Sequence, residues 1–224
     1  RAQVTIFSEN VGTPGATTLI NSYTGWQNVS PITFSSTGTQ SDVRTSSPSS
    51  SYSGASGNGN VFMGTATTNV RDFLISGINT SSYSSITLSF GVLSNTANNM
   101  LTVEVSSDGI SFTPLTVNAT IAANTWTLKS ATGSIPSVAN LRIRFSKNSG
   151  VQYRIDDIVL AGVLVSTPTT TSISPSSATA GSSGFTITVN GTNFVNGVST
   201  VRWNGANKTT TFVNSTQLTA AIDA

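Results

Sequence analysis

The residues best placed to do chemistry lie in one stretch, LRIRFSKNSGVQYRIDDIVLAG, at 141–162. Apolar residues alternate on both sides of a short loop at 146–150, which predicts a β-hairpin with its apolar side chains on one face. In that hairpin Arg142, Arg144 and Arg154 share the opposite, solvent-facing side. Arginine is the side chain best suited to hold an anionic or hydroxyl-rich ligand, because its planar fork offers several donors at once.

Two interpretations of these arginines stay open. The predicted register sets Arg142 opposite Arg154, and like charges in that position are unfavourable. Glu104 on a neighbouring strand, Asp156 or a bound anion is therefore expected to compensate. Either the arginine stems simply cover apolar surface on an exposed face, or the face binds a polysaccharide.

Asp156 and Asp157 interrupt the alternation of the same stretch. Apolar residues before the two acids have one parity and those after them, Ile158 and Leu160, have the other. A β-bulge at this point lets both sets face the core and turns one carboxylate toward the interior. A buried carboxylate must be hydrogen-bonded, paired with a cationic side chain or bound to a metal ion.

Aromatic residues near turns are candidates for stacking on sugars, and Trp26 in SYTGWQN is the strongest of them. The competing interpretation is that Trp26 packs in the core, as most tryptophans of β-sandwiches do. Trp126 and Trp203 lie in alternating sequence and are predicted to be core residues.

Composition excludes several classes of function. The chain has no Cys and no His, which removes thiolate nucleophiles, the usual general base and the common zinc ligands. Its eight acidic residues show no pattern that pairs two of them in a cleft, so we expect no enzyme activity. A net charge of +2 without a basic stripe gives no support to nucleic-acid binding.

Period-two alternation and turn residues predict an all-β chain. Alternating apolar sets occur at 4–6, 86–92, 101–105 and 141–145, and Ser107-Asp108-Gly109 predicts a tight reversal. No apolar run is long enough for a transmembrane segment. The proline-containing stretch STPTT predicts a linker at 166–170, between a sandwich at 1–165 and a second one at 171–224.

The second sandwich resembles an immunoglobulin-like TIG (IPT) domain. The resemblance rests on Ile173-Ser174-Pro175, Gly181, the run FTITVNGTNF and then STVRWNG, in that order. Such a domain usually has about seven strands. We therefore expect this module to be partial, with the chain continuing past residue 224.

The first sandwich loosely resembles jelly-roll carbohydrate-binding modules whose last strand ends in a motif similar to Asp156-Asp157-Ile158. In several of those families a structural Ca²⁺ joins the first and last strands. The resemblance implies Asp156, with Asp157 beside it, as the last-strand ligand, and Glu9 or Asn10 as its first-strand partner. Calcium takes six to eight oxygen ligands, so carbonyl groups must complete the site.

These features together predict a non-catalytic part of a large exported bacterial protein. VEVSSDGISFTPL followed by YRIDDIVLAG resembles the N-terminal modules of surface proteins exported by the type IX route. The resemblance implies an extracellular or cell-surface location, a polysaccharide or surface-glycan partner, and contact with the outer-membrane secretion machinery. The alternative is a pair of modules that attach a secreted hydrolase or nuclease to its substrate.

Overall fold

The computed structural model describes residues 2–38, 40–65, 71–147 and 150–223, and almost all its regular structure is β-strand. The contacts divide the chain into two compact units, Arg1–Leu164 and Val165–Ala224. In the described part of the chain no helix has the length and apolarity to cross a membrane. The all-β prediction is confirmed.

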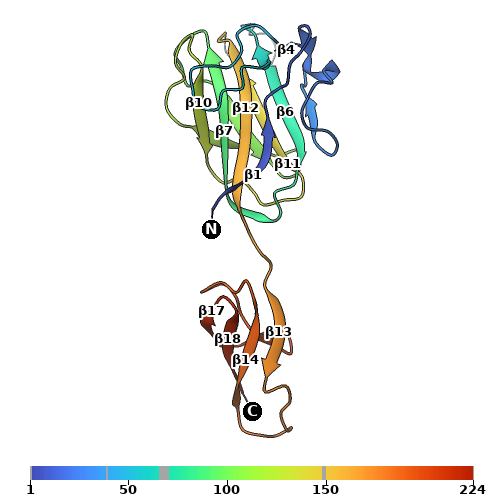
Figure 1. The fold of residues 1–224 in the computed structure, drawn as a ribbon, viewed down its shortest axis with the longest axis vertical. Helices are drawn as coiled ribbons and strands as arrows, with labels where there is room; N and C mark the ends of the chain where they lie inside the picture. Colours follow the sequence, from blue (N-terminus) through green and yellow to red (C-terminus); the bar gives the residue numbers. More distant parts are fainter. Residues whose placement is uncertain (1, 39, 66–70, 148–149, 224) are drawn as a thin grey trace. The chain divides into compact units, whose positions relative to one another are not determined.

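The first unit is built from two facing layers. The layer that we name sheet A contains the longest strands, β7 and β12, at its centre (Figure 1). Its hydrogen-bonded order is β2 (Thr18–Leu19), β4 (Ser41–Arg44), β5 (Asn60–Met63), β12 (Tyr153–Leu164), β7 (Tyr83–Ser94) and β10 (Thr127–Thr132), with β1 (Val4–Glu9) also paired to β12. All these pairs are antiparallel.

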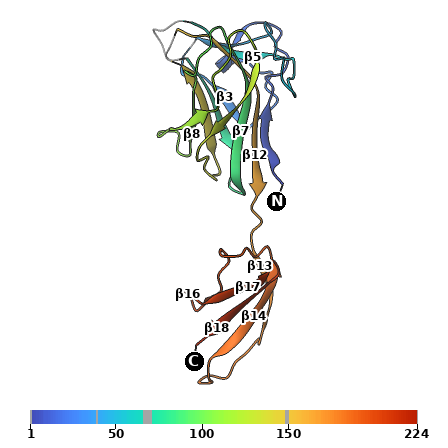
Figure 2. The ribbon, with the colours of Figure 1, turned by 90° about the vertical axis from the view of Figure 1, so that its left-hand side faces the viewer.

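The second layer, sheet B, lies behind sheet A, and Figure 2 shows the two from the side. Pairing of β9 with β10 joins the layers along one edge, so the sheet curls over on itself as in a jelly roll. The order in sheet B is β9 (Thr113–Val117), β8 (Thr102–Ser106), β11 (Leu141–Lys147), β6 (Arg71–Ile78) and β3 (Thr33–Ser35).

The core between the layers follows from the alternation of the strands. Strand β11 buries every second residue, Leu141, Ile143 and Phe145, and leaves those between partly exposed. Aromatic rings continue the packing, since Phe145 lies edge-on to Phe90 of β7 at 5.0 Å between centroids. The other face of each sheet is therefore free for polar side chains.

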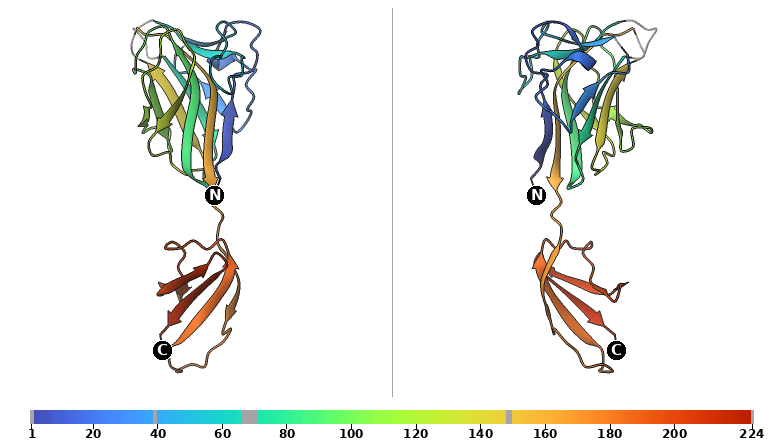
Figure 3. Two further views of the ribbon diagram at one scale, coloured as in Figure 1. Left: turned by 60° about the vertical axis from the view of Figure 1, so that its left-hand side comes forward. Right: turned by 90° about the vertical axis from the view of Figure 1, so that its right-hand side faces the viewer.

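The predicted hairpin at 141–162 is wrong. Strand β11 pairs with β6 and β8 in sheet B, whereas β12 pairs with β1, β5 and β7 in sheet A. The two strands therefore lie in different layers of the first unit, which Figure 3 shows in two further views. Alternation specifies which side of a strand faces the core, but it carries no information about the neighbouring strand.

The predicted bulge at Asp156-Asp157 is confirmed. The register of β12 against β7 shifts between Asp156 and Val159, and Asp157 has a φ of 48°. Because of this extra residue, Ile155 and Ile158 both face the core and are fully buried.

The second unit has its own sheet, ordered β13 (Thr169–Ser174), β14 (Phe185–Thr192), β18 (Gln217–Ile222) and β17 (Thr210–Asn214), and a two-stranded ribbon of β15 (Arg202–Trp203) and β16 (Ala206–Asn207). Strand β13 begins inside the segment predicted as a linker. The buried cluster contains Ile187, Val189 and Leu218. Trp203 is 37% exposed, so its assignment to the core is wrong, whereas Trp126 is buried.

Candidate functional site

The outer face of sheet B carries a continuous row of side chains that are exposed or partly exposed. The strand registers set one residue of each strand in line across all five strands. The row consists of Ser35, Leu74, Arg144, Glu104 and Pro114. It combines one cation, one anion, a hydroxyl and two apolar side chains on a surface that solvent reaches.

Arg144 is held rigidly at the centre of this row. Its Nη2 and Nε lie 2.8 and 2.9 Å from Glu104 Oε2, and its Cζ lies 3.7 Å from the centroid of the Phe112 ring. The ion pair and the cation–π contact act on the same guanidinium and fix its plane. Glu104, one of the candidates for compensating the arginine charge, is its partner.

Arg142 is on the same face, two residues before Arg144 on β11. Its Nη1 donates to the carbonyls of Ser107 and Asn140 at 3.3 and 3.4 Å. None of the ion pairs among the described residues involves Arg142. This face therefore keeps one cationic group whose charge is not neutralised.

The turn beside Arg142 is fixed by Asp108, as the Asp-Gly pair predicts. The Asp108 carboxylate accepts hydrogen bonds from the N–H groups of Ile110 and Ser111 at 2.8 and 2.9 Å, which lower the pKa of Asp108. Gly109 takes a φ of 79° and leaves no room for a side chain, since a Cβ would lie 2.9 Å from Arg142 Nε.

The outer face of sheet A differs, because the Gly- and Ser-rich segment 46–60 packs on its upper half. Side chains of the strands beneath that segment that would otherwise meet solvent are buried, including Phe62 and Arg154. Trp126 Nε1 donates to the carbonyl of Ser47 at 3.2 Å and helps to hold the segment in place. The segment therefore separates these strand side chains from solvent.

Arg154 lies under segment 46–60, on the opposite layer from Arg142 and Arg144. Its Nη1 donates to Ser46 O at 2.9 Å and to Asn60 Oδ1 at 2.8 Å, and its Cζ lies 4.8 Å from the Phe62 ring centroid. Burial, followed by the charge of Arg44, lowers the pKa of Arg154. The structure thus brings together two of the three predicted ligand-binding arginines and separates the third.

On sheet A, Arg44 contacts an acidic and an aromatic side chain, as Arg144 does on sheet B. It pairs with Asp42, with Nη2 to Oδ2 at 2.8 Å, and its Cζ lies 3.6 Å from the centroid of the Phe62 ring. Arg154 stacks on the same ring, and Phe62 is buried.

Asp156 and Asp157 lie on the outer side of β12, under the same segment. Asp157 Oδ2 accepts hydrogen bonds from the Tyr52 hydroxyl at 2.5 Å and from Ser56 N at 3.1 Å, and Asp156 Oδ2 accepts one from Ser56 Oγ at 3.1 Å. Burial, and then the Asp157 charge, raises the pKa of Asp156 to about 7. Burial and the Asp157 hydrogen bond likewise raise the pKa of Tyr52.

Glu9 has partners that suit a carboxylate without a metal ion. Its two oxygens accept hydrogen bonds from the backbone N–H groups of Val11, Gln27 and Asn28 and from the Asn28 side-chain amide, at 2.8 to 3.2 Å. Asn10 Oδ1 accepts a hydrogen bond from Gly12 N. N–H donors occupy the positions that a cation needs, so Glu9 fits a calcium site poorly.

No group of three or more acidic side chains that could hold a metal occurs in the described ranges. Asp156 and Glu9 share no hydrogen-bond partner. The calcium site at Asp156, Asp157, Glu9 and Asn10 stays a prediction.

Trp26 stacks on the side of the core rather than standing free in a loop. Its ring lies parallel to Phe34 at 4.2 Å and to Phe73 at 5.6 Å, and edge-on to Tyr23 at 5.0 Å. Trp26 is partly buried and packs against the core cluster, so packing is its evident role. A contact between Trp26 and a ligand stays a prediction.

Three members of the sheet B row, Ser35, Leu74 and Pro114, and the stacked Phe112 were not singled out from the sequence. Their position depends on which strands lie beside β11. The only signal along the chain was the alternation of β6, in which Leu74 lies between the inward-facing Phe73 and Ile75 and so on the outer side of the strand.

Comparison with known proteins identifies the second unit more clearly than the first. Residues 168–224 match the family model of the IPT/TIG domain. The unit that contains the smaller sheet therefore carries the IPT/TIG match that the motifs predict. No curated protein matches the chain.

Solved structures with a similar arrangement include carbohydrate-binding modules. The CBM22-1 xylan-binding domain of Paenibacillus barcinonensis Xyn10C is 14% identical, covering 74% of this chain and 99% of its own, with a TM-score of 0.42. TmCBM61 in complex with β-1,4-galactotriose is 16% identical, covering 58% and 88%, with a TM-score of 0.35. A variant of the family 29 module CBM29-2 is 13% identical, covering 71% and 91%, with a TM-score of 0.40. At these values the likeness adds nothing to the fold established from the strand pairing.

Proposed function

We propose that the first unit is a non-catalytic polysaccharide-binding module and that it binds its ligand on the outer face of sheet B. The observation that carries the proposal is the fixed group of Glu104, Arg144 and Phe112 at the centre of that accessible face. Its polar groups are held in place before a ligand arrives, so binding does not have to order them.

The chemistry of the row matches that of a sugar chain. Sugar hydroxyls both donate and accept hydrogen bonds, so Glu104 can accept from one hydroxyl while Arg144 or Arg142 donates to its neighbour. Leu74 and Pro114 flank the charged pair and offer apolar contact to the C–H groups of a sugar ring. A row that crosses five strands suits an extended ligand rather than a compact one.

Acidic polysaccharides fit this face better than neutral ones. Glu104 neutralises Arg144, whereas none of the ion pairs among the described residues involves Arg142. One uncompensated cation attracts a carboxylate or sulfate group and makes the affinity fall as salt is added. An affinity that does not change with salt would limit the ligand to neutral, hydroxyl-rich chains.

The test is a titration of the intact chain with soluble acidic and neutral polysaccharides, followed by Arg144→Ala. We expect the substitution to lower the affinity about tenfold or more, since it removes hydrogen bonds to a charged group. Arg44→Ala is the matched control, because Arg44 also pairs with an aspartate and stacks on a phenylalanine but lies on sheet A. Equal losses in both variants, or binding of no polysaccharide, would refute the proposal.

The setting that we propose is a large exported multi-domain bacterial protein at the cell surface, of the adhesin type, delivered by the type IX secretion machinery. Its support is the resemblance of the sequence motifs to such proteins. Localisation by antibody labelling, in cells with and without the type IX translocon, tests it. Retention of the protein inside translocon-deficient cells is the expected result, and unchanged surface labelling would count against this route.

The second candidate setting is a secreted hydrolase or nuclease that these two units attach to its substrate. The same sheet B face serves both settings. Hydrolysis of the bound polysaccharide by the native protein, and not by residues 1–224 alone, would favour this alternative.

A further inference from the structure

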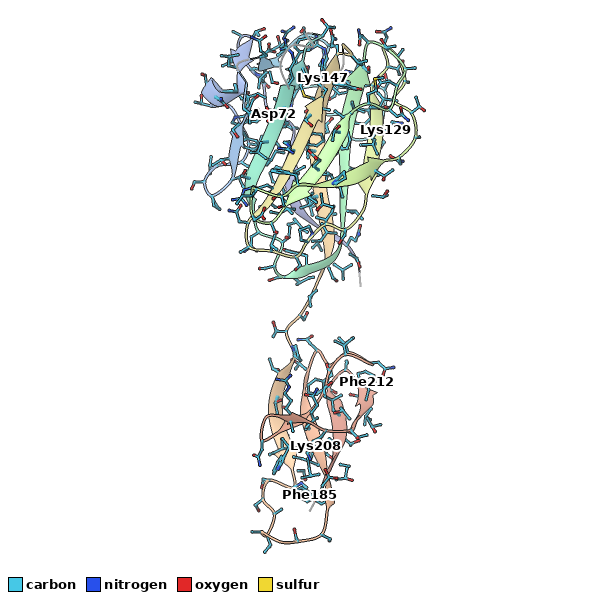
Figure 4. The ribbon with its side chains drawn as sticks, turned by 180° about the vertical axis from the view of Figure 1, so that it is seen from behind. Asp72, Lys129, Lys147, Phe185, Lys208 and Phe212 are labelled. Carbon is cyan, nitrogen blue, oxygen red and sulfur yellow. The ribbon has the colours of Figure 1, made fainter. Side chains whose placement is uncertain are left out.

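Three polar side chains point into the upper end of the first sandwich, from three different strands. They are Ser41 at the start of β4, Arg71 at the start of β6 and Lys147 at the end of β11. Of the three, Lys147 is labelled in Figure 4. Each shares the parity of a core residue on its own strand, namely Val43, Phe73 and Phe145. All three are almost completely buried, at 1%, 7% and 1% exposure.

The three residues are neighbours in the fold, since Arg71 and Lys147 lie side by side and Ser41 follows a hydrogen-bond partner of Arg71 in the chain. Arg71 and Lys147 are direct partners in the β6–β11 register. Lys147 Nζ donates to the carbonyl of Gly64 at 2.5 Å, and a Cβ on Gly64 would lie 3.8 Å from Arg71 Nη1. Both terminal nitrogens of Arg71 donate to Gln40, the residue before Ser41.

The cluster contains donors without acceptors. Arg71 Nε and Ser41 Oγ are buried and have no hydrogen-bond partner among the residues that the structure describes. Lys147 carries three N–H donors, of which one meets the Gly64 carbonyl. Buried donors are nearly always satisfied in native proteins, so two unpartnered donors beside a lysine with a single acceptor indicate a missing acceptor.

No carboxylate of the chain supplies that acceptor. Asp72, the acid nearest in sequence, faces the other side of β6 and accepts hydrogen bonds from Ser36 and Thr37. None of the three ion pairs in the described part of the chain includes Arg71 or Lys147. The ten residues outside the described ranges include no Asp or Glu.

Two adjacent buried cations without a counter-charge are costly, because each has lost its hydration. Burial first, and then the Arg71 charge, lowers the pKa of Lys147. A water molecule could accept the free hydrogen bonds, but it would leave both charges uncompensated. An anion satisfies the donors and neutralises the charge together.

We propose that Ser41, Arg71 and Lys147 form a binding site for one small spherical anion, of the halide class, at this end of the sandwich. The two Arg71 nitrogens that would clasp a planar carboxylate are already occupied by Gln40. The free donors are single groups from three strands, and a halide accepts from such donors without a directional requirement. The anion joins β4 of sheet A to β6 and β11 of sheet B and stabilises the fold.

The direct test is a crystal structure of the chain grown in sodium bromide. We expect an anomalous peak enclosed by Ser41 Oγ, Arg71 Nε and Lys147 Nζ. A well-ordered water without anomalous signal at that place would overturn the proposal.

The test in solution is thermal unfolding of the first unit in increasing chloride, at constant ionic strength kept by a bulky organic anion. The melting temperature of the native chain is expected to rise with chloride and then saturate. Ser41→Ala removes one donor to the charged ligand and is expected to weaken the apparent chloride affinity about tenfold.

Lys147→Met abolishes the chloride dependence if the site exists. Lys129→Met is the matched control, because Lys129 is also buried and also donates to a backbone carbonyl, that of Thr120 at 2.9 Å. The control should respond to chloride like the native chain. The proposal is overturned if both lysine variants respond equally to chloride, or if the native chain does not respond. If Lys147→Met does not fold, the Ser41→Ala variant and the bromide crystal decide instead.

Discussion

Replacing Asp156 with Asn should stabilise the first unit at neutral and higher pH. Asp156 is fully buried and its pKa is raised to about 7 from 3.8, first by burial and then by the charge of Asp157. Since a raised pKa means that the folded state holds its proton more tightly, the associated stability is present at low pH and is lost as the pH rises through about 7. At 1.36 kcal/mol for each tenfold change in proton affinity, ionised Asp156 costs up to about 4 kcal/mol at pH 8.

The substitution keeps the contacts of the protonated acid. Asn Oδ1 accepts the hydrogen bond that Asp157 N donates to Asp156 Oδ1 at 2.8 Å, and Asn Nδ2 can donate to Ser56 Oγ. Urea unfolding of both proteins from pH 4 to pH 8 measures the difference. We expect the two proteins to agree at pH 4 and the Asn variant to gain about 2–4 kcal/mol by pH 8.

Asp108→Asn provides a control of opposite sign. The pKa of Asp108 is lowered by the backbone N–H groups of Ile110 and Ser111, so its stability contribution is present above the ordinary pKa of 3.8 and is lost as the pH falls. The Asn variant should therefore be less stable than the native chain at neutral pH. A difference between Asp156→Asn and the native chain that does not change with pH would refute the reasoning.

Calcium bound at Asp156 would reverse the expected result. A metal ion favours the ionised carboxylate, so the native chain would be the more stable protein at pH 8 and would lose that advantage when a chelator is added.

Three further predictions concern packing and the metal. Trp26→Ala should lower the free energy of unfolding by about 3 kcal/mol, because Trp26 stacks on Phe34 and Phe73, and should leave polysaccharide affinity unchanged; weaker binding at unaltered stability would instead support a ligand contact. Gly77→Ala should lower the free energy of unfolding in urea by about 2 kcal/mol or more, since Gly77 has a φ of 92° and a Cβ would lie 2.1 Å from Pro31 O. Gly54→Ala is the control for backbone strain alone, because Gly54 has a φ of 87° and open space around it. Equal losses in the two variants would contradict the clash. If calcium is bound, a chelator should lower the melting temperature and added Ca²⁺ restore it, with about 2.7 kcal/mol regained at a hundredfold excess over the dissociation constant; an unchanged melting temperature would exclude the predicted metal.

The sequence predicted which residues of a strand face the core better than it predicted which strands pair. The change of parity between Ile155 and Ile158 correctly located the bulge in β12, because the hydrophobic pattern and the local backbone geometry are linked along the chain. Strand partners depend on contacts between distant segments, so the expected pairing of β11 with β12 failed. Glu104 was anticipated as a partner for an arginine because opposite charges attract.

The stacking of Phe112 on Arg144 had no signature along the chain. It arises only when β8 lies beside β11, which brings the segment after the Asp108 turn over the guanidinium. The predicted position of Arg154, on the same face as Arg142 and Arg144, was wrong for a related reason. Nothing in the Gly- and Ser-rich composition of segment 46–60 indicates that it packs over sheet A, with Tyr52 and Ser56 bonded to Asp157.

The two arginine groups of the first unit show why accessibility, and not residue type, determines which face can bind. Arg44 with Asp42 and Phe62, and Arg144 with Glu104 and Phe112, present the same chemistry on opposite layers. On sheet A a second arginine, Arg154, stacks on the aromatic ring, and Phe62 is buried. On sheet B the corresponding ring and its row remain in contact with solvent. Paired alanine substitutions at Arg44 and Arg144 therefore separate the chemistry of the group from its place in the fold, and only the second should affect a ligand.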